Sequence, residues 1–300
     1  MTDRPLVCVV GSLNIDTTYT VRAIPIAGET VLADTRQVSH GGKGANQAAA
    51  VAASGGSVAI VTAVGDDDAG AAAAEDLADR GIDISAIAHQ SATSTGSAVI
   101  LVGGDGENLI VVDPGANSTL NPAWVSEHVG RLAPAVLLGQ LEIPYTSLLA
   151  AAQAAPEATF VLNPAPMPDD PAEVDQLLQL ADVLVPNRSE LGQLVAGPEP
   201  RTLADVDHCA AALAFAGTLV VTLGGDGAVV YDGSRRIARI PAHDVLAVDT
   251  SGAGDAFCGG LAHRIAAGES VEMAARGATE LAAHSTTYRG ARLPQGQISR

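Results

Sequence analysis

The sequence predicts an α/β protein built on an open, mostly parallel sheet with helices on both faces. Hydrophobic residues make up 47% of the 300 residues and aromatic residues only 3%, so Ala, Val, Leu and Ile must form the core. Such a core suits parallel strands, which are buried on both faces beneath alanine-rich helices. From residue 135 onward, apolar runs alternate with helical patterns, and this alternation is typical of a parallel sheet covered on both sides.

The N-terminal part contributes two buried strands and two helices. The apolar runs at residues 6–11 and 57–65 predict the strands. Helices are predicted over 44–54 and 69–80, because each alanine-rich segment ends at a glycine, the residue favoured just after the last helical turn.

The C-terminal part continues the alternation of strand and helix. Each apolar run that predicts a strand is followed by a segment with helical spacing. Strands are predicted over 135–140, 159–163, 182–187 and 218–224, and helices over 145–155, 172–180, 189–195 and 203–216.

Two segments interrupt this rhythm. Residues 16–39 are rich in threonine and show no helical pattern, and residues 96–117 form a hairpin pattern around Gly103–Gly106. Both are patterned like half-exposed antiparallel strands, so we expect a small β lid over the main sheet. The alternative is that both are edge hairpins of the main sheet itself.

This interpretation divides the chain into two parts. The α/β domain takes residues 1–14, 41–92 and 114–300, and the β lid takes residues 15–40 and 93–113.

Charge and cysteine content exclude several classes of function. The net charge is −18, with acidic residues spread along the chain, which argues against binding to nucleic acid or to an anionic membrane. Cys8, Cys209 and Cys258 lack metal-ligand spacing and fit free thiols in a reducing cytosol. We see no signal peptide and no apolar run of ~20 residues, so we expect a cytoplasmic protein.

The sequence VDTSGAGDAFCGG at 248–260 predicts a short strand, a turn of small residues and a helix. A helix start offers free N–H groups, and the small residues Gly252, Ala253 and Gly254 allow a phosphate to approach them. Asp255 then stands beside the anion, where it can accept the proton of an attacking hydroxyl. The alternative is that Asp255 only caps the helix.

Two motifs in the N-terminal part carry polar side chains at element boundaries. GGKGAN at 41–46 lacks the spacing of a phosphate-binding Walker loop, but it places Lys43 and Asn46 one helical turn apart as donors for hydroxyl groups. In GSLNID, Asn14 and Asp16 stand two residues apart on a strand, so both side chains point to one side and suit a diol. Ordinary turn chemistry explains this second pair equally well.

The sequence PNRSE at 186–190 follows a buried strand at the edge where open α/β sheets bind ligands. Asn187 and Glu190 bear oxygen atoms suited to hydrated Mg²⁺. The alternative is a helix cap and an acid of the first helical turn.

Taken together, these motifs resemble the ribokinase-like (PfkB-type) sugar kinases, and the resemblance covers essentially the whole chain. DTSGAGDAF resembles the family's C-terminal signature, GGKGANQAAAVA its N-terminal signature, and NRSE its N-x-x-E motif. The members of this family that phosphorylate ribose are resembled by three further segments, GSLNID, GENLIVVDPGAN and GQLEIP. The resemblance implies a ribokinase-like fold and ATP-dependent phosphorylation of ribose at its primary hydroxyl, giving ribose 5-phosphate.

The resemblance also implies a role for each motif residue. Asp255 would be the general base, and the backbone of Gly252, Ala253 and Gly254 would form an anion hole. The ribose hydroxyls would be held by Asn14, Asp16, Gly42, Lys43, Asn46 and Glu142, together with Asp255. ATP would be bound by Asn187, Thr222, Gly224, Gly225, Gly227, Gly254 and Thr279. Asn187 and Glu190 would order Mg²⁺ through water.

Members of the family are activated by K⁺ and pair through the lid, so the resemblance implies a homodimer and a cation site. The cation would be bound by Asp249, Ser251, Ser285, Tyr288 and Gly290. Two positions depart from the family pattern. Pro294 stands where a serine is usual, so a side-chain ligand is lost, and Tyr288 replaces a basic residue but keeps its carbonyl.

Two rival functions remain open on the sequence. The first is a kinase for another furanose or a nucleoside, such as deoxyribose, fructose or adenosine. A nucleoside needs an apolar or aromatic surface against its nucleobase, and the aromatic-poor lid offers little of this. The second is a sugar-binding regulator without catalysis, which would have no use for a carboxylate beside an anion hole.

Overall fold

The computed structural model describes residues 6–294. Within this range the chain forms one large sheet, a separate small sheet and helices on both faces of the large one. The large sheet has nine strands, seven of them parallel, so the predicted fold class is confirmed. Its strands in spatial order are β13 (Arg235–Ile240), β12 (Ala228–Asp232), β11 (Thr218–Thr222), β10 (Val183–Leu184), β9 (Thr159–Leu162), β8 (Val136–Gly139), β1 (Leu6–Val10), β4 (Ser57–Gly65) and β5 (Asp83–Gln90).

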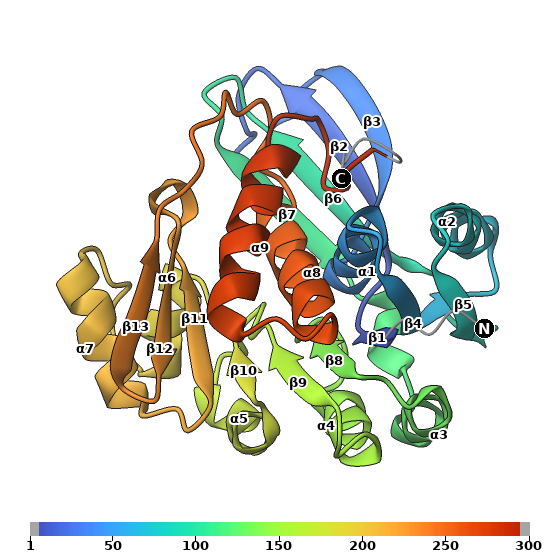
Figure 1. Cartoon of the computed structure of the whole chain (residues 1–300). Coiled ribbons are helices and arrows are strands. Elements are labelled where there is room, and N and C mark those ends of the chain that lie inside the picture. Colours follow the sequence, from blue (N-terminus) through green and yellow to red (C-terminus); the bar gives the residue numbers. More distant parts are fainter. Residues whose placement is uncertain (1–5, 295–300) are drawn as a thin grey trace.

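Two hydrophobic layers cover the large sheet, one on each face. Successive side chains of a strand point to opposite faces, so Val7 and Val9 of β1 enter one layer while Cys8 and Val10 enter the other. The first layer packs beneath α1 (Lys43–Ala53), α2 (Asp68–Asp79), α8 (Ala253–Ala266) and α9 (Val271–Ser285). The second packs beneath α3 (Pro122–Leu132), α4 (Tyr145–Ala154), α5 (Asp175–Leu180), α6 (Arg188–Leu194) and α7 (Leu203–Leu213). In Figure 1, α8 and α9 lie side by side in front of the sheet, next to α1.

The small sheet contains the two segments that interrupt the alternation. Its order is β3 (Ala33–Gly41), β2 (Asn14–Val21), β6 (Gly96–Val102) and β7 (Asn108–Asp113), and it stands above the large sheet in Figure 1. The alternative of edge hairpins on the main sheet is therefore wrong. The exact division of the chain into two domains stays a prediction.

Some local expectations differ from the structure. The helix expected over 172–180 is divided into a 3₁₀ turn, η2 (Pro171–Val174), and α5, because Asp170 caps the first piece and Pro171 starts it. Two further 3₁₀ turns are η1 (Gly115–Thr119) and η3 (Gly224–Asp226). Among residues 6–294, no helix is both long and apolar enough to cross a membrane.

The carboxyl ends of the parallel strands position the site. Beside β1 the chain adds β4 and β5 on one side and β8 to β11 on the other, so the strand order reverses between β1 and β8. Ligands of open α/β sheets bind outside the carboxyl ends of strands at such a reversal. The polar residues there are Ser12 and Asn14 after β1, Gln140 and Glu142 after β8, Asn163 after β9, Asn187 after β10, and Thr222 at the end of β11.

Candidate active site

The turn before α8 has the conformation expected of an anion-binding helix start. Gly252 is the N-cap residue with φ 71°, in the left-handed region that favours glycine. A Cβ on Gly252 would lie 2.3 Å from the Ala291 carbonyl oxygen, so only glycine fits against that segment. A Cβ on Gly254 would meet nothing within 4 Å, which leaves open space beside the first helical N–H groups.

Asp255 lies in the first turn of α8 and is almost fully buried. Gly252 and not Asp255 is the N-cap residue of α8, and both carboxylate oxygens of Asp255 bond to α1, so the helix-cap interpretation is wrong. Instead, Oδ2 accepts a hydrogen bond from Asn46 Nδ2 at 3.1 Å and Oδ1 accepts one from Gln47 Nε2 at 3.1 Å. Two amides of α1 therefore hold the carboxylate of Asp255 in a fixed orientation.

A network of buried side-chain amides holds Gln47, one of the two donors to this carboxylate, in place. Gln47 Nε2 also donates to Asn163 Oδ1 at 3.2 Å, and Gln140 Nε2 donates to Gln47 Oε1 at 2.6 Å. Asn163 Nδ2 donates in turn to the Val185 carbonyl at 2.9 Å. Sequence patterns did not indicate these residues, although Gln47 lies in GGKGANQAAAVA and Gln140 in GQLEIP.

A cavity of about 150 Å³ opens in front of Asp255. It brings together predicted residues from three separate motifs and the end of β11: Lys43, Asn187, Glu190, Thr222, Gly252, Ala253, Gly254 and Asp255. The predicted base, the anion hole and part of the predicted ATP site thus share one space.

The remaining predicted ATP residues lie outside the lining of this cavity. Gly224 and Gly225 stand in η3, directly after β11, and Gly227 closes that turn with its N–H on the Gly224 carbonyl. Thr279 is buried in α9, where its hydroxyl donates to the Ala275 carbonyl at 2.8 Å. Their role in binding ATP stays a prediction.

Lys43 and Glu190 form the charged wall of the cavity. Burial lowers the pKa of Lys43, but the carboxylates of Asp255, Glu142 and Glu190 outweigh burial and raise that pKa above its ordinary value. Burial raises the pKa of Glu190, although the Asn187 N–H and Lys43 oppose the shift. Lys43 is thus a permanent cation in a space with excess negative charge.

The predicted sugar residues other than Lys43 and Asp255 lie outside the lining of this cavity, around the start of α1 and the start of β2. Glu142 Oε2 accepts hydrogen bonds from the Ser12 hydroxyl and from Lys43 N, the latter at 3.0 Å. Asn14 Oδ1 accepts one from Asn117 Nδ2 at 2.7 Å. Gly42 has φ 85°, and a Cβ there would lie 2.7 Å from Leu13 Cα, so glycine lets α1 start directly against the segment after β1.

Asp16 faces this group with unused hydrogen-bonding capacity. Its Oδ1 is buried without a hydrogen-bond partner among the described residues. Burial, together with the Glu142 and Asp255 carboxylates, raises the pKa of Asp16 to about 6, although Arg292 acts in the opposite direction. A ligand that donates hydroxyl groups would satisfy Asp16, since an ionised carboxylate only accepts.

We therefore expect acceptor binding to weaken below a pH of about 6. A proton on Asp16 removes an acceptor, and the raised pKa moves this loss to a higher pH than for an ordinary carboxyl. Initial rates from about pH 7 to about pH 5 should show KM for the sugar rising by up to about tenfold per pH unit. The Asp16→Asn variant should have a high KM that no longer depends on pH in this range. A wild-type KM that stays constant would contradict this role.

Asn187 and Glu190 form a complete capping box at the start of α6. Glu190 N donates to Asn187 Oδ1, and Asn187 N and Nδ2 donate to the two oxygens of Glu190, each at 2.8 Å. The cap interpretation is thus confirmed. Glu190 also lines the cavity with Asp255, so the chemistry of this donor set still fits a cation.

The residues predicted to hold a monovalent cation gather around Asp249. Its Oδ1 accepts from Ser251 N at 2.9 Å and its Oδ2 from Gly290 N at 2.8 Å. Asp249 N donates to the Thr286 carbonyl at 3.0 Å, which brings the end of α9, with Ser285 and Tyr288 on either side of Thr286, against the same turn. Burial raises the pKa of Asp249, but the N–H groups of Gly290 and Ser251 outweigh it, so the pKa is lowered. Asp249 therefore remains an anion, and this set of oxygen donors fits a cation.

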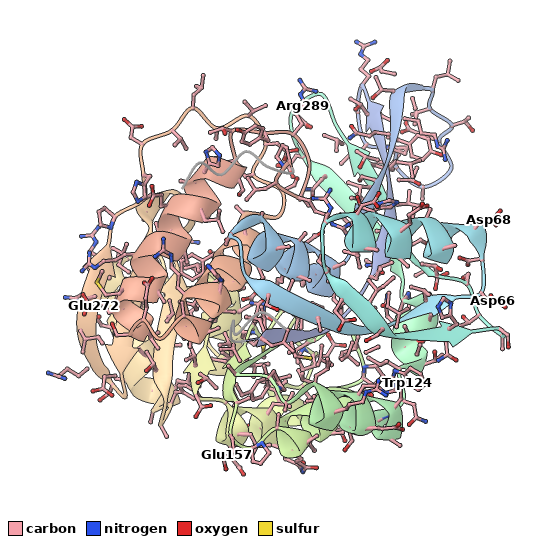
Figure 2. All side chains as sticks on the ribbon, turned by 45° about the vertical axis from the view of Figure 1, so that its right-hand side comes forward. Asp66, Asp68, Trp124, Glu157, Glu272 and Arg289 are labelled. Atoms are coloured by element: carbon pink, nitrogen blue, oxygen red, sulfur yellow. The ribbon has the colours of Figure 1, made fainter. Side chains whose placement is uncertain are left out.

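The acidic turn at 66–68 lies away from this site. Asp67 caps α2 through Gly70 N at 2.7 Å and also accepts from Thr95 N at 2.8 Å. Asp66 and Asp68 point outward at the edge of the molecule (Figure 2). Among residues 6–294, no group of three His, Cys, Asp or Glu side chains is arranged to hold a metal ion.

A wider groove of about 780 Å³ lies elsewhere on the surface. It runs over α8 and α9 beside the end of α1, and its lining includes His243, His263, Glu280 and His284. None of the residues predicted for sugar, ATP or cation binding lines this groove.

Comparison with known proteins defines the class of enzyme that carries this site. Residues 4–297 match the family described as pfkB family carbohydrate kinase. The chain belongs to this family. It is an enzyme that transfers a phosphoryl group to a carbohydrate.

Individual relatives make the comparison more specific. A ribokinase of Haemophilus influenzae is 36% identical over 296 residues, which cover 96% of this chain and 94% of that protein. A deoxyribokinase of Salmonella typhi is 33% identical over 290 residues, which cover 95% of this chain and 93% of that protein. The solved structure of Arabidopsis thaliana ribokinase complexed with ribose and ATP has 32% identity and a TM-score of 0.83, and covers 96% of this chain and 94% of that one.

Proposed function

We propose that this enzyme transfers the terminal phosphoryl group of ATP to the primary hydroxyl of D-ribose, giving D-ribose 5-phosphate and ADP. The observation that carries the proposal is the position of Asp255. Its carboxylate lines the cavity at the start of α8, and it lies close enough to Asp16 to help raise the pKa of that residue. A base in that position can serve a hydroxyl on one side and a phosphate on the other.

Asp255 accepts the proton of the primary hydroxyl as its oxygen attacks the phosphorus atom. Asn46 and Gln47 each donate to one carboxylate oxygen, so the remaining lone pairs are directed rather than free to rotate. The proton leaves the sugar oxygen as the new P–O bond forms and the bond to ADP breaks.

The phosphoryl group would lie against the first N–H groups of α8. These groups and the helix dipole stabilise negative charge on the transferring oxygens. Lys43, a permanent cation in the same cavity, adds charge at the phosphates. Asn187 and Glu190 would hold Mg²⁺ through its water shell, where it would offset charge on the ATP phosphates.

The sugar hydroxyls would be held by Asp16 and Asn14 on β2, by Gly42, Lys43 and Asn46 at the start of α1, and by Glu142. Two features support this assignment. Asp16 has an unsatisfied acceptor, and Glu142 is held in place by Ser12 and the Lys43 backbone. The small sheet would cover the sugar, since β2 and β3 both meet this group at Asn14 and Gly41.

K⁺ would bind at the turn around Asp249 and stiffen the anion hole. Asp249 bonds Ser251, next to Gly252, and Gly290, next to Ala291. A cation there would join the two segments that meet at Gly252.

The direct test is ADP release from MgATP in the presence of K⁺, measured across ribose, deoxyribose, fructose and adenosine. We expect ribose to give the highest kcat/KM. Deoxyribose is the decisive competitor, because a deoxyribokinase is among the relatives. A higher kcat/KM on deoxyribose or adenosine would overturn the sugar assignment and leave the kinase chemistry intact.

We also propose that two copies of the chain pair through the small sheet. Every residue of β7 is exposed, including the apolar run Leu109, Ile110, Val111 and Val112. Successive side chains point to opposite faces, so both faces of this edge strand expose apolar groups in the single chain. Such a patch marks an interaction surface.

Val111→Asp should therefore convert the dimer into a monomer. Val111 is 60% exposed, so the charge is tolerated in the single chain but repelled in a paired one. Sedimentation equilibrium gives the mass directly. Met273→Asp, an exposed apolar site on α9, is the matched control and should leave the mass unchanged. A wild-type protein that sediments as a monomer would contradict the proposal.

A cytoplasmic location completes the proposal. Cys8, Cys209 and Cys258 are all free and buried, which fits a reducing compartment.

A further inference from the structure

A buried arginine in the segment after α9, Arg292, contacts the asparagine that holds the Asp255 carboxylate. The Arg292 side chain is only 6% exposed. Its Nε donates to Asn46 Oδ1 at 2.9 Å, its Nη1 to Asp76 Oδ2 at 2.6 Å, and its Nη2 to the Gly41 carbonyl at 3.0 Å. One guanidinium group therefore joins α1, α2 and the end of β3.

The amide of Asn46 stands between two groups of opposite character. Arg292 can only donate hydrogen bonds, and the ionised Asp255 can only accept them. Only one of the two amide orientations therefore satisfies both neighbours: Oδ1 toward Arg292 and Nδ2 toward Asp255. The opposite orientation would set an amide oxygen against a carboxylate and an N–H₂ group against a guanidinium.

We propose that Arg292 is a positioning residue for the phosphoryl-transfer step. It fixes the amide of Asn46, and through that amide it holds the Asp255 carboxylate toward the sugar hydroxyl. The proposal rests on the proposed function, because it takes Asp255 as the group that accepts the sugar proton.

The charges around Arg292 support the same role on the sugar side. Arg292 lowers the pKa of Asp16, against burial and the Glu142 carboxylate. Burial lowers the pKa of Arg292 itself, and Asp76 opposes that shift, while an arginine stays protonated at neutral pH. Burial and Glu142 still raise the Asp16 pKa to about 6, and Arg292 limits this rise, which favours the ionised form of this second sugar-side acceptor.

A simple tether is the competing explanation, and the structure separates the two. Ala291, next to Arg292, packs its carbonyl against Gly252 at the anion hole. Loss of a tether would therefore disturb the nucleotide side of the site as well. Arg80 tethers the same segment, since Arg80 Nη1 donates to the Leu293 carbonyl at 3.1 Å and Nε to Asp76 at 3.1 Å.

The test compares Arg292→Met with Arg80→Met by steady-state kinetics in both substrates. Arg292→Met keeps an unbranched apolar stem but removes the guanidinium group and with it all three hydrogen bonds. We expect kcat to fall by about 10- to 100-fold, as for other residues that orient a reactive group through a neighbour. KM for the sugar should rise. KM for ATP should stay within about twofold, because none of the three lost hydrogen bonds goes to a residue of the anion hole. Arg80→Met removes a tether of the same segment but no hydrogen bond to Asn46, so it should leave kcat and the sugar KM near wild type, and any effect should fall on KM for ATP.

If Arg292→Met does not fold, the same measurements are made on Arg292→Lys. A lysine keeps the charge opposite Asp76, but a single ammonium cannot serve Asn46, Asp76 and the Gly41 carbonyl in their planar arrangement. We expect a loss of kcat in this variant too, with the same rise of the sugar KM.

Several outcomes would overturn the proposal. One is a wild-type kcat and sugar KM in Arg292→Met or, where that variant does not fold, in Arg292→Lys. Another is an equal rise of both KM values, shared with Arg80→Met, which would assign Arg292 a tethering role only. A wild-type enzyme without ribose-dependent ADP release is a different result: it defeats the proposed substrate, and the same comparison is then made with the acceptor that turns over.

Discussion

Replacing Asp255 with Asn is expected to lower kcat by about 10²- to 10⁴-fold, the usual contribution of a positioned general base. Asn has the same shape but cannot take up the proton of the attacking hydroxyl. Asn46 and Gln47 hold this position from α1, and a carboxylate adds no attraction for the ATP phosphates, so the affinity for ATP should be almost unchanged. Single-turnover rates and equilibrium binding of ATP separate the two quantities.

The matched control for this variant is Asp205→Asn. Asp205 occupies the same position, the third residue, in α7, where it completes a capping box with Thr202. It is a carboxylate of a first helical turn remote from the cavity, so its replacement should leave turnover unchanged. Normal turnover in Asp255→Asn would remove Asp255 from its catalytic role.

Replacing Gly252 with Ala is expected to damage the anion hole through the backbone. The new Cβ would lie 2.3 Å from the Ala291 carbonyl oxygen, and φ is 71°, so the turn must move. A shift of about 1 Å at a reacting group can lower the rate about 10²-fold. KM for ATP should rise together with the loss of kcat, since the same N–H groups receive the phosphates.

Gly268→Ala distinguishes this effect from backbone strain alone. Gly268 also has a positive φ, 87°, but a Cβ there would meet nothing within 4 Å. We expect it to cost about 1 kcal/mol of stability and to leave both kinetic constants unchanged. Equal kinetic losses in the two variants would show that the contact with Ala291 does not matter.

The order of strands and helices along the chain could be predicted because it depends on short-range sequence patterns. Apolar runs such as 57–65 gave the buried strands correctly, and the glycines at 55 and 81 marked the ends of α1 and α2. The spatial order of strands was not predictable in this way, since it depends on pairings between distant segments such as β1 with β8. The antiparallel pair β12 and β13 was also missed, although only Gly233 and Ser234 separate the two strands.

The residues of the candidate site also fall into a predictable group and an unpredictable group. Residues with a motif around them, such as Lys43 and Asp255, were predicted and do share one cavity. Gln140 and Arg292 were not predicted as site residues, because their partners Gln47 and Asn46 lie 93 and 246 residues away in the sequence. Their function depends on where the fold brings them.

The contact between the segment after α9 and the start of α8 has a consequence for protein synthesis. Gly252 packs against Ala291, and Asn46 is oriented by Arg292, so a shortened chain that stops before these residues lacks two supports of its reaction centre. A ribosome delivers the elements from β1 to α9 before this segment. Those elements can therefore collapse around the sheet on the ribosome before the reaction centre gains these two supports.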